Sequence, residues 1–233
     1  MKKLNKCVFV LFLITGFMLT SCSSDDSDEN FSEESTEDYW PTAVGNEWNL
    51  DRKGTETTIK IIDSKKANGD IYYKFDQFFE APNADLSGYA SIWIKKSNGE
   101  YYIKFDDINY TTEGITSKIT GYEIVFFKDN LDVNKTWTGS FTQNATFDYP
   151  DFPMPSIKVT SSYTGTILEK GLTEVIKNVT YKDVIKFKMV QVSKMDNQDP
   201  QTLETEYWIA KNVGIIRIKT GGSVSELTSY VKK

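Results

Sequence analysis

Hydrophobic and polar positions alternate along most of the chain, and a period of two is typical of β-strands with one buried face. In the segment Gly88–Lys96, Ile92 and Ile94 fall on one face, while Trp93 and Lys95 fall on the other. Aromatic and β-branched residues, which pack well on a pleated sheet, dominate the same regions. The pattern therefore predicts an all-β protein, with strands nearly throughout.

Further strands are expected at regular spacing along the rest of the chain. In order they are Asn109–Ile119, Tyr122–Lys128, Thr136–Thr142, Ser156–Glu169, Val179–Lys194, Leu203–Ala210, Gly214–Thr220 and Ser223–Lys232. The strand from Val179 is long, with Val184 and Ile185 in opposite phase, and a strand of this length is expected to bend or bulge around a core. Gly171–Asn178 is the one segment in which we expect a short helical turn.

Two Asn-Gly pairs predict tight turns. The segment Lys65–Asp76 reads KKANGDIYYKFD, and Lys95–Asp106 reads KKSNGEYYIKFD. Asn-Gly favours a two-residue type I′ turn because both turn positions need a positive φ. The likeness of the two segments indicates successive hairpins, which arose by internal duplication or by convergence on one hairpin sequence.

Many sequential strands joined by short turns indicate an antiparallel up-and-down meander. We expect this sheet to curve into a half-barrel or barrel, with a β-sandwich as the alternative. Residues 39–233 are long enough to bury one sizeable core, so they are assigned to a single all-β domain.

The first residues form a short basic segment, Met1–Lys6, followed by the uncharged apolar run Cys7–Thr20. A helix that spans a bilayer needs about 20 apolar residues, and this run is shorter. Its length and its basic start are typical of a secretory signal peptide, which is assigned to residues 1–21.

Leu19-Thr20-Ser21-Cys22 matches the lipobox of bacterial lipoproteins: an aliphatic residue, two small residues and a cysteine. The small side chains let a peptidase reach the bond between Ser21 and Cys22. The Cys22 thiol is the nucleophile that takes a diacylglyceryl group, and the freed amine can then receive an acyl chain such as palmitate. Two or three acyl chains give stable membrane anchoring.

The lipidated Cys22 and the acidic segment behind it, residues 22–38, are expected to form a disordered tether. Ser23–Asp38 contains eight acids and no base, so it cannot bury enough apolar surface to fold. Acids directly after the cysteine, at Asp25 and Asp26, resemble the export signal of Bacteroidota lipoproteins. That resemblance implies attachment to the outer membrane on its cell-surface side, with a periplasm-facing position as the alternative.

Charge and composition exclude several classes of function. The net charge of −6 comes from the tether, because the body from Tyr39 onward is nearly neutral, and no basic surface for nucleic acid is expected. Histidine is absent, and both cysteines, Cys7 and Cys22, lie before the body. Ser-His-Asp, Cys-His and zinc-hydrolase mechanisms are therefore excluded.

Two clusters of oxygen ligands, Asp129–Asn134 and Asp196–Asp199, are candidate calcium sites. Both lack the glycine and the distal glutamate of a calcium loop, and Asp and Asn are ordinary turn formers. Asp106 and Asp107 are adjacent on a strand, so their side chains point to opposite faces and cannot act as a catalytic pair. No metal, cofactor or catalytic residue is predicted.

The loop Asp148–Pro155, DYPDFPMP, is stiffened by three prolines that flank Tyr149, Phe152 and Met154. These three side chains are candidate contacts for a lipid, a glycan or a partner protein. Alternatively they fold back as a lid over the open end of the sheet.

Two stretches at the ends of the body resemble Bacteroidota (Flavobacterium-like) lipoproteins of unknown function. Tyr39–Leu50, YWPTAVGNEWNL, is similar to their opening Tyr-x-Pro and Val-Gly-Asn-x-Trp motif, and Tyr207–Ile218, YWIAKNVGIIRI, to their closing motif. The resemblance implies a lipocalin-like or LolA-like curved sheet around an apolar interior, without catalytic residues. We expect Trp40, Trp48 and Trp208 to be core anchors.

These features together predict a non-enzymatic lipoprotein of the cell envelope, held in the membrane by acyl chains on Cys22. Its curved β domain is expected to bind an apolar ligand or an envelope protein partner. The alternative is a surface glycan-binding accessory lipoprotein that uses exposed aromatic side chains. A degradative enzyme with a carboxylate pair is a third hypothesis.

Overall fold

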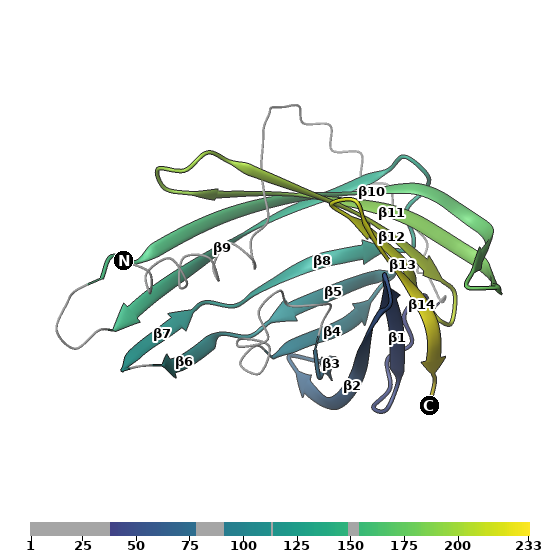
Figure 1. Ribbon diagram of the computed structural model, residues 1–233, viewed down its shortest axis with the longest axis horizontal. Coiled ribbons are helices and arrows are strands. Elements are labelled where there is room, and N and C mark those ends of the chain that lie inside the picture. The colour runs from purple at the N-terminus through teal and green to yellow at the C-terminus, as the bar shows by residue number, and fades with distance from the viewer. Residues whose placement is uncertain (1–37, 78–90, 113, 149–153) are drawn as a thin grey trace.

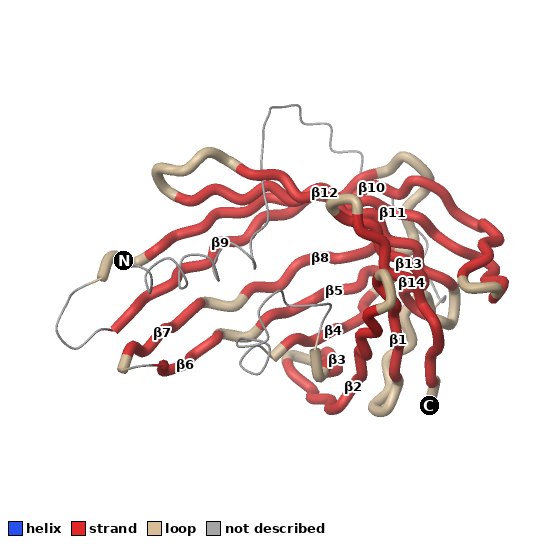
Figure 2. The backbone as a smooth tube through the Cα atoms, in the orientation of Figure 1, coloured by secondary structure: helices blue, strands red, loops and turns tan. Residues whose placement is uncertain are grey.

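The structure of the protein is a computed structural model that describes residues 38–77, 91–112, 114–148 and 154–233. The described residues form strands, turns and loops without helices (Figure 2). Among them no helix is long and apolar enough to cross a membrane. The strands are β1 (Glu47–Arg52), β2 (Thr55–Ala67), β3 (Asp70–Phe75), β4 (Ile92–Ser97), β5 (Glu100–Phe105), β6 (Ile108–Thr112), β7 (Ile115–Ile119), β8 (Tyr122–Lys128), β9 (Thr136–Asp148), β10 (Ile157–Ile176), β11 (Val179–Met195), β12 (Gln201–Ala210), β13 (Gly214–Thr220) and β14 (Ser223–Val231).

All fourteen strands belong to one antiparallel sheet, in the order β6-β7-β9-β10-β11-β12-β13-β14-β1-β2-β3-β4-β5-β8. The sheet bends round at β12–β14 and β1–β2, so that β9–β11 face β3–β5 and β8 across the interior (Figure 1). The expectation of an all-β, curved half-barrel is therefore confirmed, and the sheet is not closed. The first and last strands, β1 and β14, pair with each other in the middle of the sheet.

The predicted strand Asn109–Ile119 was wrong, because the structure divides it into the hairpin β6–β7. Gly114, with φ +80°, forms part of the turn. The chain passes from β5 to β6 and returns from β7 to β8 along closely packed connections. At Gly121 an added Cβ would lie 2.1 Å from the carbonyl oxygen of Phe105, so only glycine fits. The hairpin therefore reaches away from β5 and β8 and pairs with β9 instead.

The strands β3–β5 and β8 form one wall of the half-barrel, and β9–β11 form the opposite wall (Figure 1). Side chains, instead of a backbone ladder, join β8 to this opposite wall. The backbone N–H of Val125 donates to the Tyr163 hydroxyl at 3.0 Å, and the Trp137 indole donates to the Val125 carbonyl at 2.9 Å. In the ladder between β9 and β10, Tyr163 lies opposite Gly139 and Trp137 lies opposite Gly165. Both rings lie against the bare glycine backbone, an arrangement known from aromatic rings that cover glycines in sheets.

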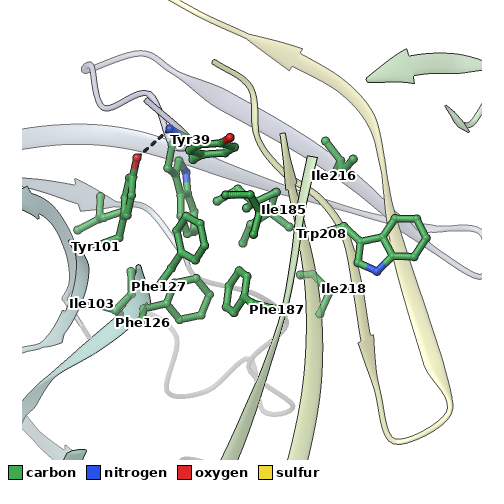
Figure 3. Close-up of a cluster of buried hydrophobic side chains, with 14 of the residues drawn as sticks. Tyr39, Tyr101, Ile103, Phe126, Phe127, Ile185, Phe187, Trp208, Ile216 and Ile218 are labelled. Atoms are coloured by element: carbon green, nitrogen blue, oxygen red, sulfur yellow. Dashed lines mark hydrogen bonds between the residues drawn. The ribbon is translucent and has the colours of Figure 1, made fainter. Parts of the chain in front are cut away.

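Aromatic side chains fill the space between the two walls (Figure 3). Phe127 and Tyr207 stack on Phe187, with ring centroids 4.7 Å and 5.1 Å away. The Tyr39 N–H donates to the Tyr101 hydroxyl at 2.8 Å, which ties the start of the body into this core (Figure 3). Side chains of the protein itself therefore occupy the centre of the half-barrel.

The two motifs at the ends of the body form one structural unit. The Trp48 indole donates to the carbonyl of Val213 at 2.6 Å, and the Asn212 N–H donates to the carbonyl of Asp38 at 2.6 Å. Gly214 has φ +108°, and an added Cβ there would lie 2.8 Å from the Trp48 indole nitrogen. The Val-Gly pair therefore provides both the turn and the space that the tryptophan needs.

Local turn chemistry behaves largely as predicted. Asn68, Gly69, Asn98 and Gly99 all have positive φ, as the two type I′ turns require. The helical turn expected over Gly171–Asn178 was wrong.

The helical turn does not form because β10 continues through bulges to Ile176 before it turns at Lys177 and Asn178. The long partner strand β11 bulges as expected: Asp183 has φ +52°, and both Val184 and Ile185 are buried.

Candidate functional site

A groove lies on the aromatic-core face of the sheet, where β1 and β13 end and where β2, β12 and β14 begin. Its volume is about 210 Å³. Its apolar lining consists of Leu50, Ile59, Leu203, Tyr207 and Ile218. Its polar lining consists of Thr57, Thr205, Thr220, Ser223, Ser225 and Arg52. Concave sites with an apolar floor and a few placed polar groups are the usual form of small-molecule sites.

The floor of the groove is continuous with the core. Leu50 and Ile59 are buried, and Tyr207 extends the stack that begins at Phe187. Burial raises the pKa of the Tyr207 hydroxyl above its usual range, although a hydrogen bond with Thr205 opposes the effect, so the group is neutral at physiological pH. The floor is therefore rigid and uncharged.

The rim of the groove carries hydroxyl groups. The Thr205 hydroxyl donates to the Thr220 hydroxyl at 3.1 Å. Ser223 and Ser225 line the groove, and within the described residues their hydroxyls make no hydrogen bond. Leu203, with 36% of its surface exposed, completes the rim on the β12 side. These groups can donate hydrogen bonds to a ligand and still leave it an apolar contact.

The groove and the entry point of the chain lie at opposite ends of the same strands. Asp38 and the two end motifs meet where β1 and β13 begin, at Trp48 and Gly214. Arg52 and Thr220, which line the groove, stand where these two strands end. The segment before Asp38 therefore enters the domain at the end remote from the groove.

A second, more open hollow of about 500 Å³ adjoins the β5–β6 and β7–β8 connections and includes Asp106 and Asp107. Burial would raise the pKa of Asp106, but hydrogen bonds from Lys104 and the Trp93 indole outweigh it, so the pKa is lowered. Asp107 accepts instead from the Gly121 N–H at 2.7 Å. The two carboxylates have separate partners and do not form a facing pair.

All five tryptophans are buried, none with more than 7% of its surface exposed. Trp93 and Trp208 lie on the outward face of the sheet, and Figure 3 shows Trp208 pointing away from the core. Lys186 and Arg217 each lie 4.2 Å from the ring of Trp208, and Lys65 lies 3.7 Å from the ring of Trp93. Such cation–π contacts shield the rings, so neither offers an open platform to a sugar. Trp208 is therefore buried and belongs to the core cluster, as predicted, although its ring lies on the outward face (Figure 3).

The oxygen clusters considered for calcium have structural roles. The buried carboxylate of Asp129 accepts from the Tyr101 hydroxyl at 3.1 Å and lies 3.8 Å from Lys96. Asn197, in the second cluster, has φ +61° in the turn between β11 and β12. Among the described residues no three Asp or Glu side chains come together as a metal site would require.

The remaining predicted site residues are those of the lipidation site and those of the loop Asp148–Pro155. Ser21, Cys22, Tyr149 and Phe152 lie outside the described residues, and Met154 is half-buried just before β10. Sequence reasoning missed the groove. The sequence did contain a signal for the groove: hydroxyl and cationic residues stand at strand positions that alternate in phase with buried residues. In β1, for example, Arg52 is in phase with the buried Trp48 and Leu50.

No protein-family model and no curated protein sequence matches the chain. Two solved structures resemble it. A candidate lipoprotein from Parabacteroides distasonis ATCC 8503 shares 12% identity at a TM-score of 0.49, covering 84% of this chain and 100% of that one. A candidate exported protein with a YmcC-like fold from Bacteroides fragilis NCTC 9343 shares 11% identity at a TM-score of 0.43, with the same two coverages. At scores and identities this low, neither likeness assigns a function.

Proposed function

We propose that the protein is an exported lipoprotein of the cell envelope whose β domain binds a small, partly apolar ligand in the groove. The groove is the observation that carries the binding function, because the rest of the described half-barrel interior is filled by aromatic side chains. The export and the anchor rest on the signal peptide and the lipobox that ends at Cys22. The proposed role is non-enzymatic, in keeping with the separate partners of Asp106 and Asp107 in the more open hollow.

The arrangement of the groove fits an anchored protein. The tether joins the body at Asp38, and the groove opens at the other end of β1 and β13. A ligand can therefore enter from the side remote from the attachment point. The glycan-binding alternative gains no support from the tryptophans, because all five are buried.

Metabolic labelling with palmitate tests the anchor. We expect the wild-type protein to be labelled and Cys22→Ala to be unlabelled, whereas Cys7→Ala, which alters only the signal peptide, is expected to keep the label. Labelling of Cys22→Ala would refute lipidation at this residue.

Protease treatment of intact cells tests the position. We propose the outer leaflet of the outer membrane, so the domain should be removed, and Asp25→Ala/Asp26→Ala should protect it while palmitate labelling persists. Survival of the wild-type domain would place it on the periplasmic side.

Native mass spectrometry of the gently purified protein tests the binding function. We expect a copurified small molecule in the wild-type protein, and its loss in Leu203→Glu, which places a charge at the rim of the groove. Tyr230→Glu is the matched control, because Tyr230 is exposed and does not line the groove. Equal occupancy in Leu203→Glu and the wild type would show that the copurified molecule does not bind in the groove.

A further inference from the structure

We infer that the groove continues past Leu203 onto a row of uncharged polar side chains, and that its ligand is an amphiphile with a neutral head of several hydroxyl groups; this inference rests on the proposed function. Leu203 and Thr205 line the groove, and Gln201 precedes them on β12 in the same phase. Because side chains two residues apart on a strand share a face, Gln201 lies on the face that forms the groove. In the ladder it stands opposite Ser193 of β11, so the polar surface passes from the rim of the groove to β11.

Two buried serine hydroxyls carry the row across β11 and β10. Ser161 lies opposite Ser193, and its hydroxyl donates to the Ser193 hydroxyl at 2.6 Å. The Gln191 amide donates to the same oxygen at 3.1 Å. Ser193 thus accepts two hydrogen bonds, while its own hydrogen has no acceptor within the described residues. This hydrogen can be donated to a ligand.

Two glutamines of this face have side-chain carbonyl oxygens without a donor. The Oε1 atoms of Gln143 in β9 and of Gln201 are buried and have no hydrogen-bond partner in the described part of the chain. Gln143, with only 2% of its surface exposed, stands opposite Val159 in β10, which is the same-face neighbour of Ser161. A buried acceptor without a donor costs free energy. A ligand that donates hydrogen bonds to these oxygens removes that cost.

The charged side chains at this end of the four strands stand in the opposite phase. In residues 141–148, 157–163, 191–195 and 201–205 they are Asp148, Lys158, Lys194 and Glu204, and all four are exposed. Arg52, the charged residue of the groove lining, already takes part in an interaction within the chain. The row therefore offers no partner to a charged head, whose burial would be costly. A hydroxyl both donates and accepts without a charge, so it pairs with a serine and with either end of a glutamine amide.

The dimensions of the row and of the groove limit the ligand. The row crosses the four adjacent strands β9–β12, a span of about 14 Å at about 4.8 Å between neighbours, so it can contact several hydroxyl groups. Leu50, Ile59 and Ile218 form an apolar floor in a groove of about 210 Å³. This volume lies below the range of about 300–1,000 Å³ that drug-sized ligands occupy. The apolar chain in the groove is therefore short, or it is the end of a longer one.

Binding of six-carbon probes tests the assignment. The protein is the mature chain, residues 22–233, carrying Cys22→Ser so that no acyl group is attached. Hexyl β-glucoside has the inferred head, 1-hexanol has the same chain with a single hydroxyl, and hexanoate has a charged head. NMR titration gives the three dissociation constants. We expect hexyl β-glucoside to bind about tenfold more tightly than 1-hexanol, a difference of about 1.4 kcal/mol, and hexanoate to bind no more tightly than 1-hexanol.

Two glutamines near the start of β12 form the matched pair of variants. Gln201→Leu should lower the affinity for hexyl β-glucoside to that for 1-hexanol, without weakening 1-hexanol. Gln198→Leu makes the same replacement in the exposed turn between β11 and β12, so it should bind all three probes as the wild type does. Equal losses of hexyl β-glucoside binding in both variants would refute recognition by Gln201.

A second pair keeps the test decisive if Gln201→Leu fails to fold. Ser193→Ala should weaken hexyl β-glucoside relative to 1-hexanol, whereas Ser162→Ala, at an exposed position in the opposite phase, should not. Equal binding of hexyl β-glucoside and 1-hexanol by the wild type, or tighter binding of hexanoate, would refute the neutral hydroxylated head and leave the proposed function standing. Absence of binding by every probe, with no shift at groove residues, would refute the groove as a binding site.

Discussion

Replacement of Gly165 by alanine tests whether aromatic side chains join the two walls of the half-barrel. A Cβ at this position would lie 2.2 Å from two ring carbons of Trp137, on the neighbouring strand. Real Cβ atoms do not approach that closely, so the indole must move. Its hydrogen bond to Val125 at 2.9 Å and its packing against Phe187 would then be lost.

The expected cost follows from three contributions. Overpacking of a well-packed site costs about 1–3 kcal/mol, and loss of one hydrogen bond costs about 1 kcal/mol. Replacement of a glycine by alanine also lowers the conformational entropy of the unfolded chain, which stabilises the folded state by about 0.4–1 kcal/mol. Gly165→Ala should therefore lower the free energy of unfolding by about 2 kcal/mol.

A double-mutant cycle in urea, followed by circular dichroism, measures this cost and identifies its cause. In a Trp137→Val background the ring is absent, so Gly165→Ala should become neutral or stabilising by up to about 1 kcal/mol. The coupling should thus be about 2 kcal/mol or more. The reasoning is refuted if Gly165→Ala costs the same with and without the indole, or if it costs nothing in the wild type.

Three further outcomes are expected from unfolding measurements. Tyr163→Phe should cost about 1 kcal/mol because the N–H of Val125 loses its acceptor; an unchanged midpoint would contradict this bond. Gly99→Ala should lower the free energy of unfolding more than Gly69→Ala does, by about 1 kcal/mol or more. Both glycines have positive φ, but only at Gly99 would the added Cβ meet a buried carboxylate oxygen, that of Asp129 at 2.7 Å. Equal losses in the two variants would contradict this contact. Because the pKa of Asp106 is lowered in the folded protein, its contribution to stability is present above the carboxyl's unfolded-state pKa and is lost as the pH falls through the folded-state pKa. Asp106→Asn should therefore reduce the loss of unfolding free energy on acidification. An unchanged pH dependence in this variant would refute the pKa shift.

Features set by local chemistry could be predicted from the sequence. Asn68-Gly69 and Asn98-Gly99 form their turns because both positions require a positive φ, whatever the neighbouring strands do. Alternation likewise placed Ile94 and Trp93 on opposite faces of their strand, and in the structure Ile94 lies in the core whereas Trp93 has Lys65 over its ring. In such cases the information lies within a few residues of the feature.

Features that depend on the register between strands could not be predicted. Trp208 is buried on the outward face because Lys186 and Arg217 stand opposite it on the two neighbouring strands, and the sequence does not show which strands those are. A glycine inside a strand signals a close approach, but the partner ring of Gly165 follows only from the pairing of β9 with β10. The groove was missed for the same reason, since five separate strands contribute to it.

The pairing of β1 with β14 has a consequence for the order in which the protein folds. A chain that crosses a membrane from its N-terminus delivers β1 first, and the partner Ser223–Val231 arrives with the last residues. Until then one side of β1 remains an unpaired edge, exposed to association with other chains. Completion of the sheet must therefore wait until β14 is available, and before that point the free edge of β1 is open to aggregation.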